Sequence, residues 1–243
     1  MCVLQSNVWE IYDALIAGIS DTEYVEDFAV GLHWSYVASK NNMGVAMTYD
    51  NDFYLQKMPQ NICGKSLKEV AMYVKSWDFV EATLGLAAIN CYYNKVSLAT
   101  EKKAGSAFTF HQQALVGKKV GMIGHFKGIE EQLANICELT VFERQMQSGD
   151  YPDTACEYLL PEQDIVILTA STLINKTFPR LLQLAKNAQV IMLGPSTPFA
   201  SILHHFGVTY LSGFVVQNLE ATKISIREGP HGSIFKYGIK INI

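Results

Sequence analysis

The sequence offers its clearest chemistry at Gly124-His125-Phe126, which ends the short apolar run Val120–Ile123. A strand that ends in glycine and turns into a helix aims backbone N–H groups at a ligand above the sheet, where they can hold an anionic group. His125 at that strand end can donate or accept a proton, or ligate a metal. Glu143 lies 22 residues after Gly121, at the predicted end of the next strand, where a carboxylate can bind a hydroxyl or an amine. His125 and Glu143 are therefore the candidate acid–base pair.

Two later strand ends carry small polar residues that would meet the same rim of the sheet. The run Asp164–Leu168 leads into hydroxyl and amide side chains, which either cap the next helix or hold a ligand. The run Val190–Leu193 leads into a rigid loop with two prolines, in which Thr197 is expected to cap a helix beginning at Pro198. The predicted ligand-binding residues of the whole rim are Gly124, Phe126, Ser171, Thr172, Asn175, Gly194, Pro195, Ser196 and Thr197.

Several motifs that would fix an activity are missing from the sequence. The spacing Gly121-x-x-Gly124-x-x-x-Gly128 departs from the dinucleotide fingerprint G-x-G-x-x-G, so these glycines can equally serve a tight turn and close packing. Neither Ser171 nor Ser196 lies in G-x-S-x-G, which argues against a serine hydrolase elbow. No local spacing of His and Cys suits a metal, although distant residues could still form a site. The example considered is His33, His125 and Glu143.

Composition narrows the class of protein. The 243 residues carry a formal net charge of −4, and lysine and arginine are spread thinly, which argues against a nucleic-acid-binding protein. No apolar run approaches the roughly 20 residues that span a bilayer, and the first residues do not resemble a signal peptide. The five cysteines never form C-x-x-C, so no disulfide framework is expected. We expect a cytoplasmic protein.

The elements that position the candidate residues lie in the second half of the chain. Apolar runs alternate there with helical patterns, which is typical of a parallel sheet covered on both faces. A helical pattern follows the first run from about Gly128 to Cys137, and the tail is expected to add two antiparallel strands. The predicted strands are Lys119–Ile123, Leu139–Glu143, Asp164–Leu168, Val190–Leu193, Val208–Leu211, Ala221–Ile226 and Ser233–Ile241, and the predicted helices include Phe178–Asn187 and Pro198–Phe206.

The first half predicts a small α+β unit. Helical spacing over Asn7–Ile19 precedes two predicted strands, Glu26–Ser39 and Met43–Tyr49, joined by a polar hairpin turn. Two helices follow, the first capped by Ser66 with Glu69. The second, Asp78–Tyr92, is rich in alanine and leucine and is expected to be buried against the strands. Periodicity fades between about Ser97 and Gln113, which predicts a linker and domains at residues 1–105 and 106–243.

Four strings in these elements carry a resemblance to a known family. They are LGLAAIN (84–90), VGMIGHF (120–126), LTASTLIN (168–175) and LGPSTPF (193–199), and the match extends over most of residues 80 to 215. The chain resembles the family named "putative heavy-metal chelation". That resemblance implies an α/β protein in which a small α+β domain similar to the enolase N-terminal fold precedes a Rossmann-like parallel-sheet domain. Its linker departs from the family, with Phe108-Thr109-Phe110-His111 in place of a more acidic stretch.

The resemblance also implies a ligand cleft between the two domains, to which Asn90 of the first domain would contribute. The leading hypothesis is a protein that binds a small, polar, heteroaromatic metabolite or a metal chelate in this cleft. The resemblance implies condensation or hydrolysis of a pterin-, flavin- or siderophore-like molecule, and whether the protein is an enzyme is left open. His125 would move protons, Glu143 would bind the ligand, and Asn90 would orient it. The alternatives are a non-catalytic metal- or metallophore-binding protein and a nucleotide- or S-adenosylmethionine-dependent transferase. The cofactor is left open, with a transition metal as the candidate, and aromatic residues on the first strands could form a homodimer face.

Overall fold

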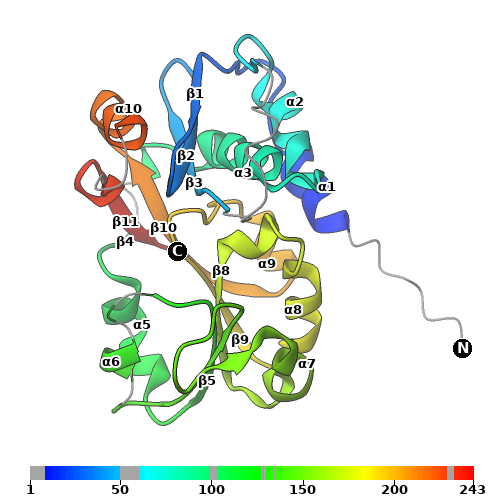
Figure 1. Cartoon of the computed structure of the whole chain (residues 1–243), viewed down its shortest axis with the longest axis vertical. Coiled ribbons are helices and arrows are strands. Elements are labelled where there is room, and N and C mark those ends of the chain that lie inside the picture. Colours follow the sequence, from blue (N-terminus) through cyan, green and yellow to red (C-terminus); the bar gives the residue numbers. More distant parts are fainter. Residues whose placement is uncertain are drawn as a thin grey trace, which may run out of the picture.

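The computed structural model describes residues 9–49, 61–98, 103–126, 128, 130–133, 135–228 and 233–243. Cys2, the first two residues of the predicted N-terminal helix, and residues 99–102 of the predicted linker lie outside these ranges. A small unit, built from the first part of the chain, sits against the upper edge of a larger sheet flanked by helices (Figure 1). Among the described residues, no helix is both long and apolar enough to span a bilayer.

The N-terminal unit packs helices against a three-stranded antiparallel sheet in the order β1-β2-β3. Ser66 caps α2 in a complete capping box with Glu69, as the sequence predicts. The helix α3 begins after its N-cap Asp78 and packs on β2 and β3, with every residue from Ala82 to Cys91 buried. The elements of this unit are α1 (Glu10–Ala17), β1 (Asp27–Val30), β2 (Trp34–Ala38), β3 (Met43–Met47), α2 (Leu67–Ala71) and α3 (Phe79–Tyr93).

The second unit contains an eight-stranded sheet in the order β4-β11-β10-β9-β8-β5-β6-β7, counted over the described residues. The six strands from β10 to β7 are parallel, while β11 and β4 are antiparallel additions at one edge. The sheet strands are β4 (Lys103–Ala104), β5 (Lys119–Ile123), β6 (Glu138–Glu143), β7 (Tyr151–Pro152), β8 (Ile165–Thr169), β9 (Gln189–Leu193), β10 (Val208–Val216) and β11 (Gly238–Asn242).

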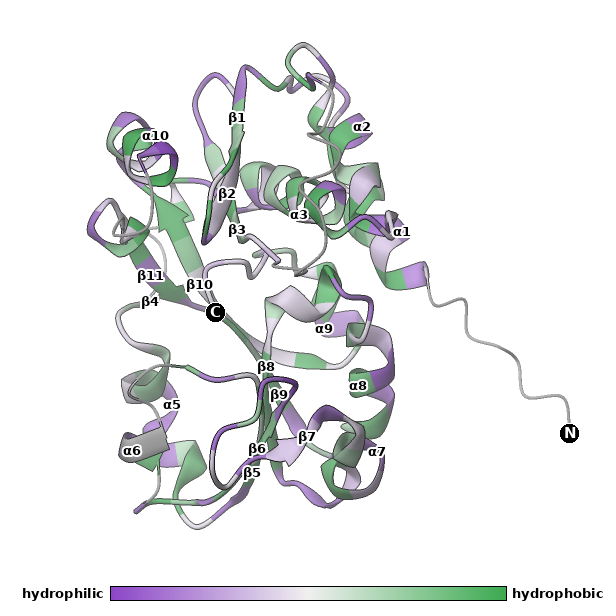
Figure 2. Ribbon diagram, in the orientation of Figure 1, coloured by the Kyte–Doolittle hydropathy of each residue, from purple (hydrophilic) through white to green (hydrophobic). Residues whose placement is uncertain are grey.

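Helices cover both faces of this sheet (Figure 1). Because side chains alternate along a strand, Ile165 and Ile167 pack with α5 and α6, while Val166 and Leu168 join the core under α7, α8 and α9. Figure 2 shows hydrophobic colour in β10, in which every residue from Leu211 to Val216 is buried. The helices are α5 (Ala107–Leu115), α6 (Glu130–Leu133), α7 (Cys156–Leu159), α8 (Phe178–Leu184), α9 (Ile202–His205) and α10 (Leu219–Arg227).

The direction in which successive strands are added to the sheet reverses between the parallel neighbours β5 and β8. From β5 the chain continues to β6 on one side, whereas from β8 it continues to β9 on the other. The loops after β5 and β8 therefore diverge and leave a crevice at their carboxyl ends, which is where open α/β sheets bind ligands. This is the rim at which the sequence predicts the site.

The two units share a hydrophobic core. Tyr36 and Val45 of the N-terminal sheet pack with Phe214 and Val216 at the far end of β10, and with Ile226 of α10. The strand β10 continues four residues past its last pairing with β9 at Ser212, so this end of β10 reaches the N-terminal unit. This shared core holds the N-terminal unit against the end of β10.

The structure corrects several predicted elements. The predicted strand Glu26–Ser39 is two strands, β1 and β2, separated by a turn. The predicted tail strand Ala221–Ile226 is the helix α10, because Asn218 caps it and Thr222 and Ile226, one turn apart, are its buried residues. Part of the predicted linker forms α5.

The predicted helix Pro198–Phe206 is reduced to α9, which begins at Ile202 with Ser201 as its N-cap, so Thr197 caps no helix. The reason lies in α3. Asn94 at its end donates to Thr197 O at 2.9 Å, the carbonyl that a helix capped by Thr197 would use for its first hydrogen bond, and accepts the amide of Phe199 at 2.9 Å.

Candidate functional site

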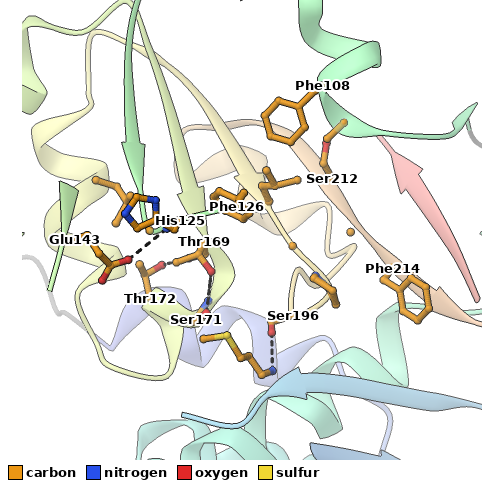
Figure 3. Close-up of a pocket in the computed structure, with 18 of the residues that line it drawn as sticks. Phe108, His125, Phe126, Glu143, Thr169, Ser171, Thr172, Ser196, Ser212 and Phe214 are labelled. Carbon is orange, nitrogen blue, oxygen red and sulfur yellow. Dashed lines mark hydrogen bonds between the residues drawn. The ribbon is translucent and has the colours of Figure 1, made fainter. Parts of the chain in front are cut away.

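A cavity of about 730 Å³ lies between the two units, above the carboxyl ends of β5, β8 and β9 (Figure 3). Three of its residues, Trp34, Met47 and Tyr49, come from the N-terminal unit. The cavity brings together ten of the twelve predicted site residues; Asn90 and Thr197 do not line it. The ten are Gly124, His125, Phe126, Glu143, Ser171, Thr172, Asn175, Gly194, Pro195 and Ser196.

His125 is held in place by a carboxylate that the sequence did not identify. Its Nε2 lies 2.7 Å from Oδ2 of Asp150, whose side chain is only 5% exposed. The same oxygen accepts the amide of Gln147 at 2.6 Å. Burial opposes ionisation of Asp150, but the hydrogen bonds from Gln147 and His125 outweigh it and lower the pKa of Asp150. An ionised Asp150 accepts a hydrogen bond from the His125 ring and fixes its orientation.

Glu143 braces the loop that carries His125. Its Oε2 accepts the backbone amide of His125 at 3.3 Å, and its Oε1 accepts the amides of Arg144 at 2.6 Å and Gln145 at 3.3 Å. Oε1 thus accepts two hydrogen bonds, whereas Oε2 accepts one and can accept a second. Glu143 therefore has a structural role at the rim in addition to any contact with a ligand.

The glycines of the first turn have distinct roles. Gly124 has φ +88°, a conformation that other residues rarely adopt, and a Cβ there would meet Thr169 Cγ2 at 3.4 Å. A Cβ on Gly121 would approach Leu160 and Gln163 to about 3 Å, so Gly121 serves close packing. Gly124 thus serves a tight turn and Gly121 serves close packing, which is the structural alternative to a dinucleotide fingerprint that the sequence left open.

Two of the backbone amides predicted to hold an anion donate to carbonyl groups within the protein. The amide of Gly124 donates to Phe142 O at 3.0 Å, and that of Thr197 donates to Gly194 O at 3.0 Å. Within the described residues, the helix that follows β5 is only the single turn α6. A ligand anion at Gly124 or Thr197 would therefore compete with these backbone hydrogen bonds.

The loop after β8 presents hydroxyl groups that bond to one another. Thr169 Oγ1 lies 2.8 Å from Ser171 Oγ, and Thr172 Oγ1 donates to Thr169 O at 2.6 Å. Thr169 also caps the 3-10 turn that follows by accepting the amide of Ser171. Ser171 and Thr172 are buried in the cavity wall, so they fix the loop and present fixed polar atoms to a ligand.

The loop after β9 is tied to the N-terminal unit. Ser196 Oγ accepts the amide of Met47 at 2.8 Å, and Asn90 Nδ2 donates to Ser196 O at 2.9 Å and to Val45 O at 2.8 Å. Asn90 is fully buried behind this loop, as is Thr197. Asn90 does not line the cavity, and it supports the cavity wall through its bonds to Ser196 O and Val45 O.

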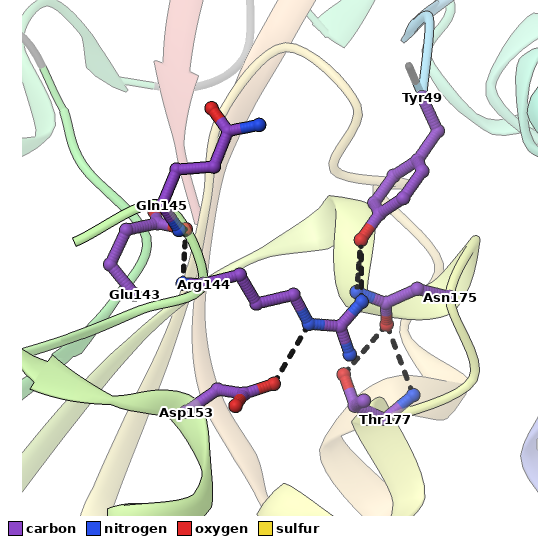
Figure 4. A network of polar contacts seen from close by, with 7 residues as sticks. All are labelled: Tyr49, Glu143, Arg144, Gln145, Asp153, Asn175 and Thr177. Carbon is purple, nitrogen blue, oxygen red and sulfur yellow. Dashed lines mark hydrogen bonds and ion pairs between the residues drawn. The ribbon is translucent and has the colours of Figure 1, made fainter. Parts of the chain in front are cut away.

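A second polar network at the cavity joins predicted Asn175 to three residues that the sequence did not identify, Tyr49, Arg144 and Asp153 (Figure 4). Arg144 Nε donates to Asp153 Oδ2 at 2.8 Å, and Arg144 Nη1 donates to Tyr49 Oη at 2.8 Å. Asn175 Nδ2 donates to the same Tyr49 oxygen at 3.2 Å, while its Oδ1 accepts the amide and hydroxyl of Thr177. Tyr49 thus joins the N-terminal unit to loops of the larger unit. The only sequence signal was the position of Arg144 directly after Glu143.

The donor groups of the cavity do not suit a metal ion bound by the protein alone. Among the described residues, no group of three or more His, Cys, Asp and Glu side chains could hold one. Cys156 lines the cavity, but burial raises the pKa of its thiol to about 12, so it stays protonated. His125 Nε2 and the Glu143 oxygens already have protein partners.

Comparison with known proteins gives the family. Residues 106–243 match DUF364 and residues 12–93 match DUF4213, both described as "Putative heavy-metal chelation". An uncharacterized protein of Methanocaldococcus jannaschii is 30% identical over 230 residues, which cover 87% of this chain and 86% of that protein.

Two solved structures share the fold. A DUF364-family protein of unknown function from Desulfitobacterium hafniense DCB-2 superimposes with a TM-score of 0.91 at 38% identity, covering 97% of this chain and 98% of that chain. One from Pyrococcus horikoshii gives a TM-score of 0.80 at 28% identity, with the same coverage. The chain belongs to the DUF364 family of "Putative heavy-metal chelation" proteins, with a DUF4213 region before it.

Proposed function

We propose that this protein binds a small, ring-containing polar metabolite, free or as its metal chelate, in the cavity between its two units. We further propose that His125 transfers protons in the hydrolysis or condensation of that metabolite. The observation that supports this most is the His125–Asp150 pair, 2.7 Å apart at the cavity wall, with the carboxylate almost fully buried. An imidazole oriented by a buried carboxylate is a common arrangement for general acid–base catalysis.

The shape and lining of the cavity support a small organic ligand. Its volume of about 730 Å³ falls within the range of sites for small molecules. Phe108, Phe126 and Phe214 supply flat apolar surface, as Figure 3 shows, and aromatic side chains favour stacking or edge contacts with ligand rings. Hydroxyl groups of Ser171 and Thr172 give the cavity fixed polar atoms on the side of His125.

The residues divide the proposed reaction between them. His125 accepts a proton from an attacking group and returns it to the leaving group, and ionised Asp150 stabilises the imidazolium formed in between. Oε2 of Glu143 has one remaining lone pair, which accepts a hydroxyl or amine of the ligand. Asn175 contributes its amide at the other side of the mouth, and the loop of Gly194, Pro195 and Ser196 closes the wall that Asn90 supports.

A metal enters this proposal as part of the ligand. The protein donors near His125 have protein partners, so a heavy metal would be held by the organic molecule and the chelate would be the cargo or substrate. The family description couples its members to heavy-metal chelation, which agrees with such a ligand. A protein that binds a bare metal ion is the competing outcome.

The proposal is tested by incubating the protein with a small-molecule cell extract and following every mass over time. We expect masses that decline with the wild type and with His205→Ala, a variant of an exposed histidine outside the cavity. The same masses should persist with His125→Asn. A substrate consumed equally by His125→Asn would remove His125 from the chemistry. An extract unchanged by the wild type would contradict the catalytic part of the proposal.

A further inference from the structure

The far end of the cavity differs chemically from the His125 end. Ser212 and Phe214 on β10 and Lys240 on β11 all line it. Phe214 pairs directly with Lys240 in the antiparallel register, and Ser212 lies two residues away on the same face of the sheet. The antiparallel ribbon β10–β11 therefore builds this wall from a cation, a hydroxyl and an aromatic ring.

The two ends are well separated. Glu143 ends β6, and Lys240 lies on β11, five strands further along the sheet. At about 4.8 Å per strand this is a distance of about 24 Å, so the two ends contact different parts of a ligand or different ligands. Charge also differs, because carboxylates Glu143, Asp150 and Asp153 lie with His125 and Arg144 at the first end.

Lys240 is a cation without a carboxylate partner among the described residues. Its Nζ lies 4.9 Å from the centroid of the Phe235 ring, and Phe235 also lines the cavity. Arg144, the cavity cation at the other end, is instead neutralised by Asp153 at 2.8 Å. Of the two cavity cations Arg144 and Lys240, an incoming anion would therefore meet an unneutralised charge at Lys240.

Two hydroxyl groups accompany Lys240. Ser106 lines the cavity next to Gly105, whose amide donates to Lys240 O at 3.0 Å, and the Ser106 side chain makes no capping hydrogen bond to α5. Ser212 Oγ lies 3.1 Å from His111 Nε2, and burial lowers the pKa of His111 to about 4, so the ring is neutral near pH 7. Ser212 thus has a fixed partner in a neutral ring.

We propose that the β10–β11 end of the cavity is an anion subsite, in which Lys240, Ser106 and Ser212 bind the carboxylate or phosphate group of a ring-containing ligand. The ring lies against Phe214 and Phe108. This rests on the proposed function for the ring and adds that the ligand is an acid. Lys240 supplies the charge, and the serine hydroxyls donate hydrogen bonds to the anion.

The test compares three probes with one bicyclic ring: 2-naphthol, 2-naphthoate and 2-naphthyl phosphate. Affinities are measured by calorimetry at low and high salt for the wild type, Lys240→Gln and the control Lys236→Gln, a lysine outside the cavity lining. We expect at least one acid to bind about tenfold more tightly than naphthol to the wild type and the control. Lys240→Gln and high salt should each remove most of that advantage. The tighter acid identifies carboxylate or phosphate.

The outcomes separate the two proposals. Acids that bind no better than naphthol, or an advantage that survives in Lys240→Gln, would overturn the anion subsite. If naphthol then binds equally to all three proteins, the proposal that the cavity binds a ring-containing ligand still holds. Acids that bind through Lys240 while naphthol does not bind would support the subsite and remove the ring contact. Binding of none of the three probes would overturn the subsite.

Discussion

Asn94 is predicted to be a major link between the two units. It ends α3, and its side chain makes three hydrogen bonds to the larger unit. Nδ2 donates to Thr197 O at 2.9 Å and to Phe214 O at 3.2 Å, and Oδ1 accepts the amide of Phe199 at 2.9 Å. Asn94 is 2% exposed, so water cannot replace these bonds if the side chain is removed.

The expected loss of stability follows from the number of these hydrogen bonds. A hydrogen bond contributes about 1 kcal/mol net, and a buried group left without a partner costs about 1–3 kcal/mol. Asn94→Ala removes three bonds and leaves two carbonyls and one amide buried without them. We expect the free energy of unfolding to fall by about 3 kcal/mol or more, a large share of the about 5–15 kcal/mol that stabilises a typical domain.

Urea unfolding followed by circular dichroism measures this loss. Asn187→Ala, at an exposed asparagine, is the matched control and should stay within about 0.5 kcal/mol of the wild type. The linkage between α3 and the loop after β9 would be refuted by an Asn94→Ala variant that loses less than about 1 kcal/mol.

Three further predictions address packing and titration. Gly44→Ala places a Cβ 2.1 Å from Ala87 O and should lower the melting temperature markedly, because β3 would be pushed away from α3. Burial lowers the pKa of His111 from 6.5 to about 4, so below pH 6.5 the unfolded chain binds a proton that the folded chain rejects. The unfolding free energy should therefore decrease as the pH falls from about 6.5 to about 4. In His111→Gln this pH dependence should be weaker, because up to one fewer proton is taken up on unfolding. Iodoacetamide with mass spectrometry should label exposed Cys63 and spare Cys156, whose buried thiol stays protonated; equal labelling of both would contradict that burial.

The sequence predicted the parallel strands because their apolar runs end at clear turn residues. The structure places β5 at Lys119–Ile123, as predicted, and Glu143 at the end of β6. Strand ends of a parallel sheet share one edge, so the rim residues could be assembled without a structure. The helix α10 escaped prediction because its buried positions lie one turn apart in a short segment whose β-branched residues also suit a strand.

The partners of the rim residues could not be predicted. Asp150 lies in an irregular loop 25 residues after His125, and no periodic pattern connects the two. The family resemblance placed Asn90 at the ligand cleft, whereas its side-chain amide donates to Val45 O and Ser196 O. Such contacts depend on how the two units pack together, which local patterns do not encode.

Native mass spectrometry of the gently purified protein, followed by denaturation and elemental analysis of what is released, tests the central claim directly. We predict an organic molecule retained in the cavity, with any metal present in fixed ratio to it. A stoichiometric metal without an organic ligand would contradict the claim and favour a protein that binds the metal itself.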